Sequence, residues 1–376
     1  MIYLDNAATT KMYEELLCIY KEFGTDNFFN PSALYKRALD ITVKIRQARA
    51  DLANFLGANH NEIIFTGSAT EANNMALRGA IRANSNIVIS AGEHSSVYKT
   101  ALSLKNNGVL CELIPLNKNG QVNQDKLYNY LSNNKVSIVS IIHVSNETGA
   151  INDIKEIAKN IKKISPSTLL HSDGVQAFGK IPVKNLGIDL YSIAAHKIKG
   201  PKGIGALYIK KGVHLNPIIT GGGQENNLRS GTENVANILA FAAAIKLFSS
   251  HFNFDKMLEL REIFIKTLTA EIGDIIFTLS DDYNTMPHII SLIVPDIKGE
   301  TLLHMLESQD ILIGLGSACS ANNKGNRVLQ ELGYTSKQTE SSIRISFSPD
   351  NTIDEIKYAA QVMASSIKEY RIINKK

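Results

Sequence analysis

Over its first two thirds the chain alternates between short apolar runs and helix-length segments, and this alternation restricts its possible folds most. The apolar runs predict strands at residues 62–66, 86–90, 111–116, 136–144, 168–173, 190–195 and 204–210. Segments long enough for helices separate most of them, at residues 71–82, 96–107 and 152–164. Strands that are apolar throughout and alternate with helices indicate a mainly parallel sheet covered on both faces. We therefore predict an α/β fold with a mainly parallel seven-stranded sheet.

The pattern of predicted strands and helices changes after the three glycines at 221–223. A long helical region over residues 235–272 leads into predicted strands at 287–294 and 341–348, with helices between and after them. We interpret this part as a smaller α+β domain. The expected division is an N-terminal segment (1–14) that packs with the small domain, a large domain (15–254), and a small C-terminal domain (255–376) that carries the loop of Cys319.

Composition excludes several classes of protein. The 376 residues are 44% hydrophobic, which is enough for a large core, and 40 basic against 36 acidic side chains leave a net charge of only +4. A surplus this small, with no Trp and 7% aromatic residues, argues against direct binding of nucleic acid. No stretch of about 18 apolar residues predicts a membrane span, and the N-terminus lacks the pattern of a signal peptide. We expect a cytoplasmic protein.

The number and spacing of the cysteines also indicate a cytoplasmic protein. Only Cys18, Cys111 and Cys319 occur, and three widely spaced cysteines fit a reducing compartment and predict no cysteine metal cluster. Cys18 and Cys111 lie in a helical and a strand-like run, so we expect them to be small buried side chains. Cys319 lies among Gly, Ser, Asn and Lys in a segment whose composition predicts an exposed loop. That context favours a reactive thiol, although a buried hydrophobe is the simpler alternative.

Ligands of open α/β sheets bind beyond the carboxyl ends of the strands, so the polar residues there are informative. Residues 66–71 (Thr-Gly-Ser-Ala-Thr-Glu) follow a strand and open a helix, and free N–H groups at a helix start favour phosphate. The spacing of Ser68 and Glu71 equally fits a capping box. Residues 200–205 (Gly-Pro-Lys-Gly-Ile-Gly) lack the strand-to-helix context of a nucleotide-binding loop and predict a turn.

Two successive strands end in groups suited to one cofactor. Asp173 closes the strand at 168–173, and Lys197 follows the strand at 190–195. A Lys that bonds to the aldehyde and an Asp that pairs with the pyridinium nitrogen are the features of a pyridoxal phosphate site. Lys199 and Lys202 compete with Lys197 for the first role. Because Asp and Lys are also ordinary surface residues at strand ends, the pair by itself leaves the cofactor open.

Longer motifs remove that ambiguity. They are Tyr-Leu-Asp-Asn-Ala-Ala-Thr-Thr at 3–10, Asn-Pro-Ser at 30–32, Phe-Thr-Gly-Ser-Ala-Thr-Glu-Ala-Asn-Asn at 65–74, Glu-His at 93–94, Ser-Asn-Glu-Thr-Gly at 145–149, Asp-Gly-Val-Gln at 173–176, His-Lys at 196–197, the turn at 200–205, Arg-Ser-Gly-Thr-Glu-Asn at 229–234, Gly-Ser-Ala-Cys-Ser at 316–320 and Ser-Ile-Arg-Ile-Ser at 342–346. In this order, and along essentially the whole chain, they resemble the pyridoxal-phosphate-dependent cysteine desulfurases of the class V aminotransferase family, of the iron–sulfur-cluster type. The resemblance implies fold type I of the pyridoxal phosphate enzymes.

The resemblance also implies roles for individual residues. Lys197 would carry pyridoxal 5'-phosphate, Asp173 would pair with its ring nitrogen, and His94 would stack on the ring and shuttle protons. The remaining roles are contacts to the cofactor's phenolic oxygen and the substrate (Gln176 and Asn146), phosphate contacts (Ala69, Thr70 and His196), and a phosphate contact made to the other subunit of a homodimer (Thr232). Arg344 would bind the substrate carboxylate through its planar guanidinium. Cys319 would be the nucleophile that accepts sulfur.

The function that follows is the conversion of L-cysteine to L-alanine, with sulfur passed as a persulfide on Cys319 to an acceptor protein. The resemblance leaves an iron–sulfur scaffold and a tRNA-thiolation protein open as the acceptor. The nearest alternative is a selenocysteine lyase or another class V enzyme. A non-catalytic scaffold that binds a partner is disfavoured because Lys197, Asp173, His94 and Cys319 are all present.

Three positions depart from the family pattern. Ala194 stands where a Ser usually contacts the phosphate, so either cofactor affinity is reduced, or Ser192 or a backbone N–H substitutes. Tyr35 and Ala38 stand where His and Gly are usual, and we expect this change to affect the active-site entrance.

Overall fold

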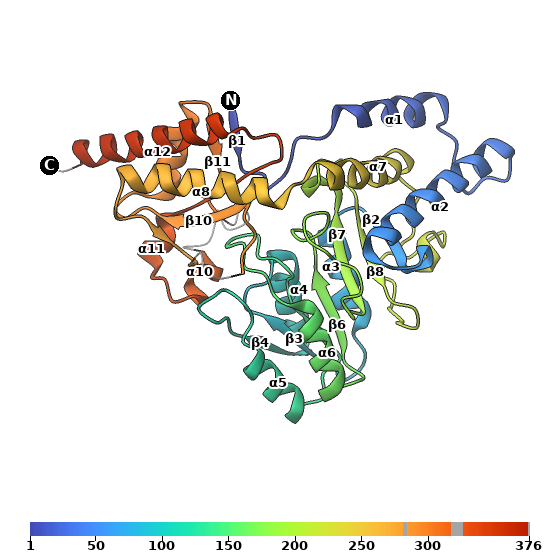
Figure 1. Ribbon diagram of the computed structural model, residues 1–376. Coiled ribbons are helices and arrows are strands. Elements are labelled where there is room, and N and C mark those ends of the chain that lie inside the picture. The colour runs from blue at the N-terminus through green and yellow to red at the C-terminus, as the bar shows by residue number, and fades with distance from the viewer. Residues whose placement is uncertain (281–283, 317–325, 375–376) are drawn as a thin grey trace.

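A seven-stranded sheet forms the centre of the larger part of the molecule in a computed structural model, which describes residues 1–280, 284–316 and 326–374 (Figure 1). Its strands are β2 (Ile63–Thr66), β3 (Asn86–Ser90), β4 (Leu110–Ile114), β5 (Ile138–Ser140), β6 (Leu169–Asp173), β7 (Leu190–Ala194) and β8 (Gly205–Ile209). Their order is β2-β8-β7-β6-β5-β3-β4, and only β8 runs antiparallel to its neighbours. This confirms the predicted mainly parallel sheet with all seven of its strands.

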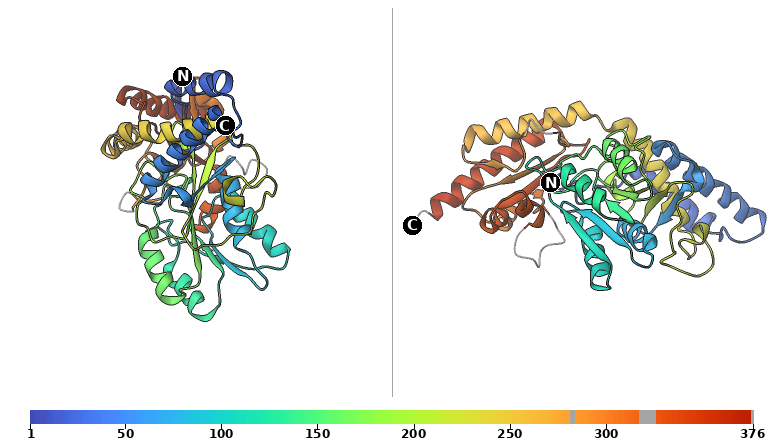
Figure 2. Two further views of the ribbon diagram at one scale, coloured as in Figure 1. Left: turned by 90° about the vertical axis from the view of Figure 1, so that its right-hand side faces the viewer. Right: turned by 90° about the horizontal axis from the view of Figure 1, so that it is seen from below.

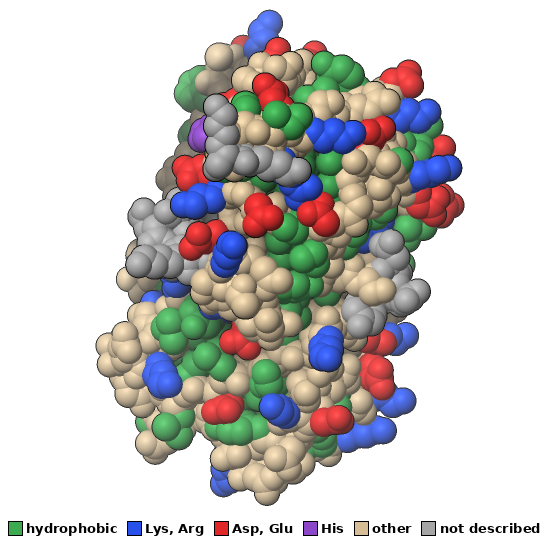
Figure 3. Space-filling model, turned by 90° about the vertical axis from the view of Figure 1, so that its left-hand side faces the viewer, with side chains coloured by type: hydrophobic (Ala, Val, Ile, Leu, Met, Phe, Trp, Pro, Cys, Tyr) green, Lys and Arg blue, Asp and Glu red, His purple; other side chains and the backbone are tan. Residues whose placement is uncertain are grey.

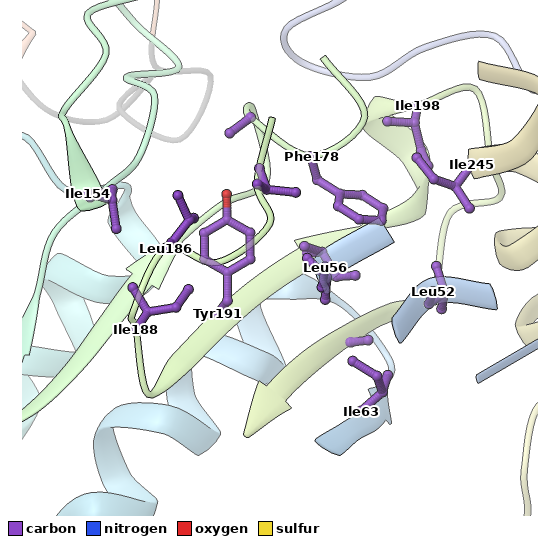
Figure 4. Close-up of a cluster of buried hydrophobic side chains, with 14 of the residues drawn as sticks. Leu52, Leu56, Ile63, Ile154, Phe178, Leu186, Ile188, Tyr191, Ile198 and Ile245 are labelled. Atoms are coloured by element: carbon purple, nitrogen blue, oxygen red, sulfur yellow. The ribbon is translucent and has the colours of Figure 1, made fainter. Parts of the chain in front are cut away.

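Helices cover both faces of this sheet. They are α2 (Lys36–Leu56), α3 (Ala69–Ala80), α4 (Ser95–Asn106), α5 (Gln124–Asn133), α6 (Ile154–Ile164) and α7 (Val235–His251). Buried side chains of α2, α6 and α7 form one core, which Figure 4 shows around Phe178 and Tyr191. Buried side chains of α3 and α4 form a second core on the other face. In α2 the buried positions recur every three or four residues, because one stripe of an amphipathic helix faces the sheet.

A second group of strands and helices lies at one end of the molecule (Figure 2). Its strands are β9 (Ile276–Phe277), β10 (Ile289–Ile293) and β12 (Ser342–Ser346), which form an antiparallel sheet, and β1 (Ile2–Leu4) and β11 (Ile311–Ile313), which pair in parallel. Its helices are α8 (Phe254–Glu271), α9 (Gly299–Glu307), α10 (Arg327–Glu331), α11 (Ser336–Glu340) and α12 (Ile353–Ile373). Helices α8, α9 and α12 share a hydrophobic core with these strands, and Leu4 from the N-terminal strand also belongs to it. The domain boundaries at residues 14 and 254 stay a prediction.

The helical region expected at 235–272 is confirmed, and it consists of two helices. Helices α7 and α8 meet at an angle of 67°. Asn253 causes the break, since its side chain accepts a hydrogen bond from the backbone N–H of Lys256 and so caps a new helix. Helix α7 packs in the first core and α8 in the core at the end of the molecule. Among the described residues no single helix is long and apolar enough to cross a membrane, and only the bent pair α7–α8 passes such a test together.

Candidate active site

A pocket of about 270 Å³ opens at the carboxyl ends of β6 and β7, where the large sheet faces the second group of strands. Nine of the residues predicted for the site line it: Ala69, Thr70, His94, Asn146, Asp173, Gln176, His196, Lys197 and Arg344. They come from segments spread over the whole chain, and Ala7, Ala8, Glu147 and Gly316 are among the other residues that line the pocket. The structure therefore brings the predicted residues together at the edge of the sheet where ligands of α/β folds bind.

Asp173 is held rigidly at the end of β6. It is 4% exposed, its Oδ1 accepts the backbone N–H of Val175 at 3.1 Å, and its Oδ2 accepts Nδ2 of Asn73 at 2.7 Å. Asn73 lies on α3 and is fully buried. The sequence analysis gave Asn73 no role, although a polar residue among the apolar positions Ala72, Met75 and Ala76 of a helix was a usable signal.

Lys197 ends the short 3₁₀ turn (Ala195–Lys197) that follows β7. Its Nζ donates to the carbonyl oxygens of Ala7 and Ala8, each at 2.6 Å, so the N-terminal segment forms part of the same wall. Its two competitors lie elsewhere. Lys199 pairs with Asp350, and Lys202 is exposed. Of the three lysines only Lys197 lines the pocket.

His94 stands at the start of α4 and caps it, because its Nδ1 accepts the backbone N–H of Ser96 at 3.2 Å. The hydroxyl of Ser96 lies 2.8 Å from the same nitrogen. Burial lowers the pKa of the His94 ring, the carboxylate of Asp173 opposes this, and nearby cations led by Lys197 lower it further. The net effect favours the neutral form of the imidazole.

One end of the pocket suits a phosphate. Ala69 and Thr70 open α3, whose N-cap Ser68 accepts the N–H of Glu71 at 3.2 Å. Only this half of the expected capping box is present, because Oε2 of Glu71 accepts the N–H of Gly67 instead. Gly205 on β8 allows the strand to approach this helix start, because a Cβ there would lie 2.8 Å from the backbone nitrogen of Ala69. The backbone N–H groups at this end can bind an anion.

His196 lines the same end and lies beside the N-terminal segment, with its Nδ1 3.3 Å from Oγ1 of Thr9. Burial and the cations Lys197 and Lys202 lower the pKa of His196 to about 3. It would therefore meet a phosphate as a neutral hydrogen-bonding group. Ser192, suggested above as a substitute for the serine missing at Ala194, is fully buried and does not line the pocket. Its hydroxyl lies 3.0 Å from Nε2 of His171, so that suggestion is wrong.

The other end suits a carboxylate. Arg344 lies on β12 and is 2% exposed, with Nη1 donating to the carbonyl of Asn146 at 2.8 Å and Nη2 to Oδ1 of Asp5 at 2.7 Å. Its Nε has no hydrogen-bond partner in the described part of the chain. The contact with Asp5 is an ion pair at the wall of the pocket, and the binding of a substrate carboxylate by Arg344 stays a prediction. The sequence analysis missed Asp5, which is 339 residues away in the chain.

Gln176 and Glu147 each present an unsatisfied oxygen at the pocket. Nε2 of Gln176 donates to the carbonyl of Ala7 at 2.8 Å, and its Oε1 is unpartnered among the described residues. Glu147 is 7% exposed, one of its oxygens is likewise unpartnered, and burial raises its pKa. Unsatisfied buried polar atoms around a cavity indicate a polar ligand.

The other predicted residues lie apart from these. Cys319 lies outside the described residues, whereas Gly316, three positions before it, lines the pocket. Thr232 is exposed and lines a different pocket, beside Gly67 and Arg229, so its predicted contact with the other subunit stays a prediction.

Other expectations fare differently. Cys18 is exposed because it lies on the outer side of α1 (Leu17–Lys21), so its expected burial is wrong. Cys111 is half-buried. Tyr35 and Ala38 do not line the pocket. Within the described ranges no group of three or more His, Cys, Asp or Glu side chains could hold a metal ion.

Comparison with known proteins shows the family to which the chain belongs. A model of the aminotransferase class-V family matches residues 2–359. A cysteine desulfurase IscS of Dictyoglomus turgidum is 35% identical over 382 residues, which cover 99% of this chain and 96% of the relative. Among solved structures, a NIFS-like protein superposes with a TM-score of 0.89 at 29% identity, covering 98% of this chain and 99% of the other. A structure described as SspA in complex with cysteine superposes with a TM-score of 0.80 at 28% identity, covering 94% of this chain and 100% of the other.

These matches confirm the family and the fold type that the motifs predicted. The chain belongs to the aminotransferase class-V family and, within it, to the cysteine desulfurase group.

Proposed function

We propose that the protein is a pyridoxal-phosphate-dependent cysteine desulfurase that converts L-cysteine to L-alanine and passes the sulfur, as a persulfide on Cys319, to an acceptor protein. The observation that carries the proposal is the meeting of Lys197, Asp173 and Arg344 in one pocket. Two comparisons support it: the relative named a cysteine desulfurase, and the neighbouring structure described as a complex with cysteine.

The residues present fit pyridoxal phosphate. A buried carboxylate, a lysine amine and the start of a helix line one pocket, as the ring nitrogen, the aldehyde and the phosphate of that cofactor require. Oε1 of Gln176 and Nε of Arg344 are buried without partners among the described residues, so a ligand can satisfy them. When bound, the cofactor supplies an electron sink for negative charge at the substrate's Cα.

The chain's own residues then bind the substrate and move its protons. Arg344 binds the carboxylate of cysteine, and its contacts to Asn146 and Asp5 hold the guanidinium in place. The amine of Lys197 takes the proton from Cα, while Asp173 stays ionised to keep the ring nitrogen protonated. The thiolate of Cys319 attacks the substrate sulfur, so that an S–S bond forms as the Cβ–S bond breaks. The electron pair left on Cβ takes up a proton, which completes the methyl group, and the amine of Lys197 returns a proton to Cα, so that the product is alanine.

The acceptor and the cellular setting belong to the same proposal. The acceptor is an iron–sulfur scaffold or a tRNA-thiolation protein, and the reaction takes place in the cytoplasm without a nucleic-acid or membrane partner. On the face shown in Figure 3, Lys and Arg side chains are interspersed with Asp and Glu. Proteins that bind nucleic acid instead gather basic side chains on one face. Transfer of labelled persulfide sulfur to each purified candidate acceptor would distinguish them.

The working unit is a homodimer in this proposal. Side chains of Tyr35, Leu39 and Val43 are spaced four residues apart at the start of α2 and are at least 50% exposed, and Leu34 beside them is 91% exposed. An apolar face of this kind is typical of an interface between subunits. A dimer would also give the exposed Thr232 a phosphate to contact. Leu39→Asp should produce monomers in sedimentation, whereas Ile372→Asp, at the exposed end of α12, should not; a dimer unaffected by Leu39→Asp would contradict this interface.

The central test is alanine formation from L-cysteine by the parent and by Lys197→Ala. The variant should fold, lose the visible absorbance of bound cofactor and lose all turnover, whereas Lys202→Ala should keep both. Persulfide on Cys319 can be detected by mass spectrometry, and L-selenocysteine in place of L-cysteine tests the selenocysteine lyase alternative. A parent protein that binds the cofactor but forms no alanine from cysteine would overturn the proposal.

A further inference from the structure

Asp173 and His94, two predicted cofactor contacts, are the ends of a hydrogen-bonded chain of four polar side chains. Asn73 and Ser96 lie between them. Nδ2 of Asn73 lies 2.7 Å from Oδ2 of Asp173 and 2.7 Å from Oγ of Ser96. The same Oγ lies 2.8 Å from Nδ1 of His94. Asn73 is fully buried, Ser96 is 8% exposed and Asp173 is 4% exposed, so water does not compete strongly for these bonds.

The direction of each hydrogen bond follows from the two ends of the chain. An ionised carboxylate only accepts, so the amide of Asn73 must point its NH₂ group at Asp173. The second hydrogen of that group then goes to Oγ of Ser96, which acts as acceptor. The hydroxyl of Ser96 therefore keeps its own proton for donation, and the acceptor within reach is Nδ1 of His94.

The backbone gives independent support for the same assignment. The N–H of Ser96, a group that can only donate, points at Nδ1 of His94 at a distance of 3.2 Å. A proton on Nδ1 would oppose both this N–H and the hydroxyl of Ser96. A neutral imidazole with an unprotonated Nδ1 carries its proton on Nε2.

We propose that Ser96 and Asn73 are positioning residues that hold His94 as the Nε2–H tautomer, so that His94 presents a hydrogen-bond donor to the ligand in the pocket. In this arrangement His94 has no free lone pair on Nε2 and does not serve as the base that activates the sulfur-accepting thiol. The inference deepens the proposed function and rests on it for the nature of the ligand, while the tautomer itself depends only on this chain.

Most of the charged groups that face His94 also favour the neutral form of its ring. Lys197 after β7, Arg327 on α10 and Arg344 on β12 all disfavour a cationic ring, and Asp173 on β6 favours it. Donation from Ser96 to Nδ1 adds to the first three, because a hydrogen bond accepted by the neutral form stabilises that form.

The test is nuclear magnetic resonance of the full-length protein with ¹⁵N-labelled histidine rings, both with the cofactor bound and after its removal. His94→Gln assigns the resonance. The parent should show a protonated Nε2 and an unprotonated Nδ1 at pH 7. Ser96→Ala should raise the pKa of His94 by about half a unit to one unit, the worth of one hydrogen bond, and Asn73→Ala should shift it in the same direction. Ser96→Thr keeps the hydroxyl and should restore the parent value.

Ser103→Ala is the matched control, because Ser103 lies on the same helix and its hydroxyl accepts a hydrogen bond from Arg78, outside the chain of contacts to His94. A parent protein with its proton on Nδ1 would overturn the inference, and so would a Ser96→Ala titration that coincides with that of Ser103→Ala. These outcomes are separate from the proposed function, which is tested by alanine formation: a protein with no desulfurase activity can still show the tautomer, and an active enzyme can lack it.

Discussion

The two ends of the pocket are built in different ways. The cofactor end consists of groups that directly follow strands of one sheet or open the next helix, such as Asp173, Lys197 and Ala69. The carboxylate end is assembled from parts that are remote in the chain: Arg344 on β12, Asp5 after β1, and the backbone of Asn146. The first end depends on local geometry at a sheet edge, whereas the second exists only if both groups of strands fold and pack together. Changes at the two ends should therefore affect different steps.

The largest expected effect comes from the cofactor end. Asp173→Asn removes the charge that keeps the ring nitrogen protonated, so kcat should fall on the order of 10²- to 10³-fold. The KM for cysteine should change little, because the carboxylate end is untouched. Steady-state kinetics and the absorbance of the bound cofactor check this. A variant that lost affinity for cysteine while kcat stayed intact would erase the distinction between the two ends.

The second effect tests the carboxylate end. Arg344→Gln removes charge-assisted hydrogen bonds to the substrate and should raise KM about 10- to 100-fold, because such bonds contribute about 1.5–3 kcal/mol each. Cofactor absorbance should be that of the parent. Arg371→Gln is a matched control, since Arg371 makes a similar two-pronged contact to Asp274 at the surface of α12. An equal rise in KM in both variants would mean that Arg344 acts only through general stability.

The third effect is on stability and concerns the sheet under the cofactor end. Burial lowers the pKa of His143 and of His171 to about 4, below the ordinary value near 6.5. Between these values the unfolded chain binds more protons, so stability should be intact above pH 6.5 and fall as the pH drops towards 4, by up to about 1.4 kcal/mol per pH unit for each histidine. Urea midpoints from pH 7 to 4.5 measure this. His171→Gln should weaken the dependence, and the exposed His304→Gln should leave it unchanged; a midpoint independent of pH would contradict the assignment.

The smallest effect concerns the ion pair at the carboxylate end of the pocket. Gly314 lies opposite Arg344, and a Cβ there would come within 2.4 Å of Oδ1 of Asp5 and 3.1 Å of Nη2 of Arg344. Gly314→Ala should displace this ion pair and raise KM about fivefold, with the cofactor spectrum unchanged. Gly273→Ala, where a Cβ meets nothing within 4 Å, provides the control. Parent-like kinetics for Gly314→Ala would show that the Asp5–Arg344 contact does not orient the guanidinium.

The sequence predicted best those structural features that depend on a few consecutive residues. The strands of the large sheet other than β4 were visible as apolar runs because nearly all of their side chains are buried on both faces, whereas β4 lies at the edge and is largely exposed. The break between α7 and α8 was also a local signal, since Asn253 is a good N-cap, but the apolar residues on both sides obscured it. Cys18 and Ser192 were misjudged because exposure and hydroxyl partners depend on what packs above a segment.

The amino-acid sequence by itself determined the strand pattern, the family motifs and the residue types able to hold the cofactor, since these depend on short-range periodicity and on the identity of neighbouring residues. Only the tertiary structure decided which lysine faces the pocket, that Asp5 supports Arg344, and that Asn73 and Ser96 join Asp173 to His94. Apart from the contact between Ser96 and His94, which are two positions apart, these contacts join residues from 23 to 339 positions apart. Their geometry depends on how the strands and helices pack, and no local pattern in the chain encodes that packing.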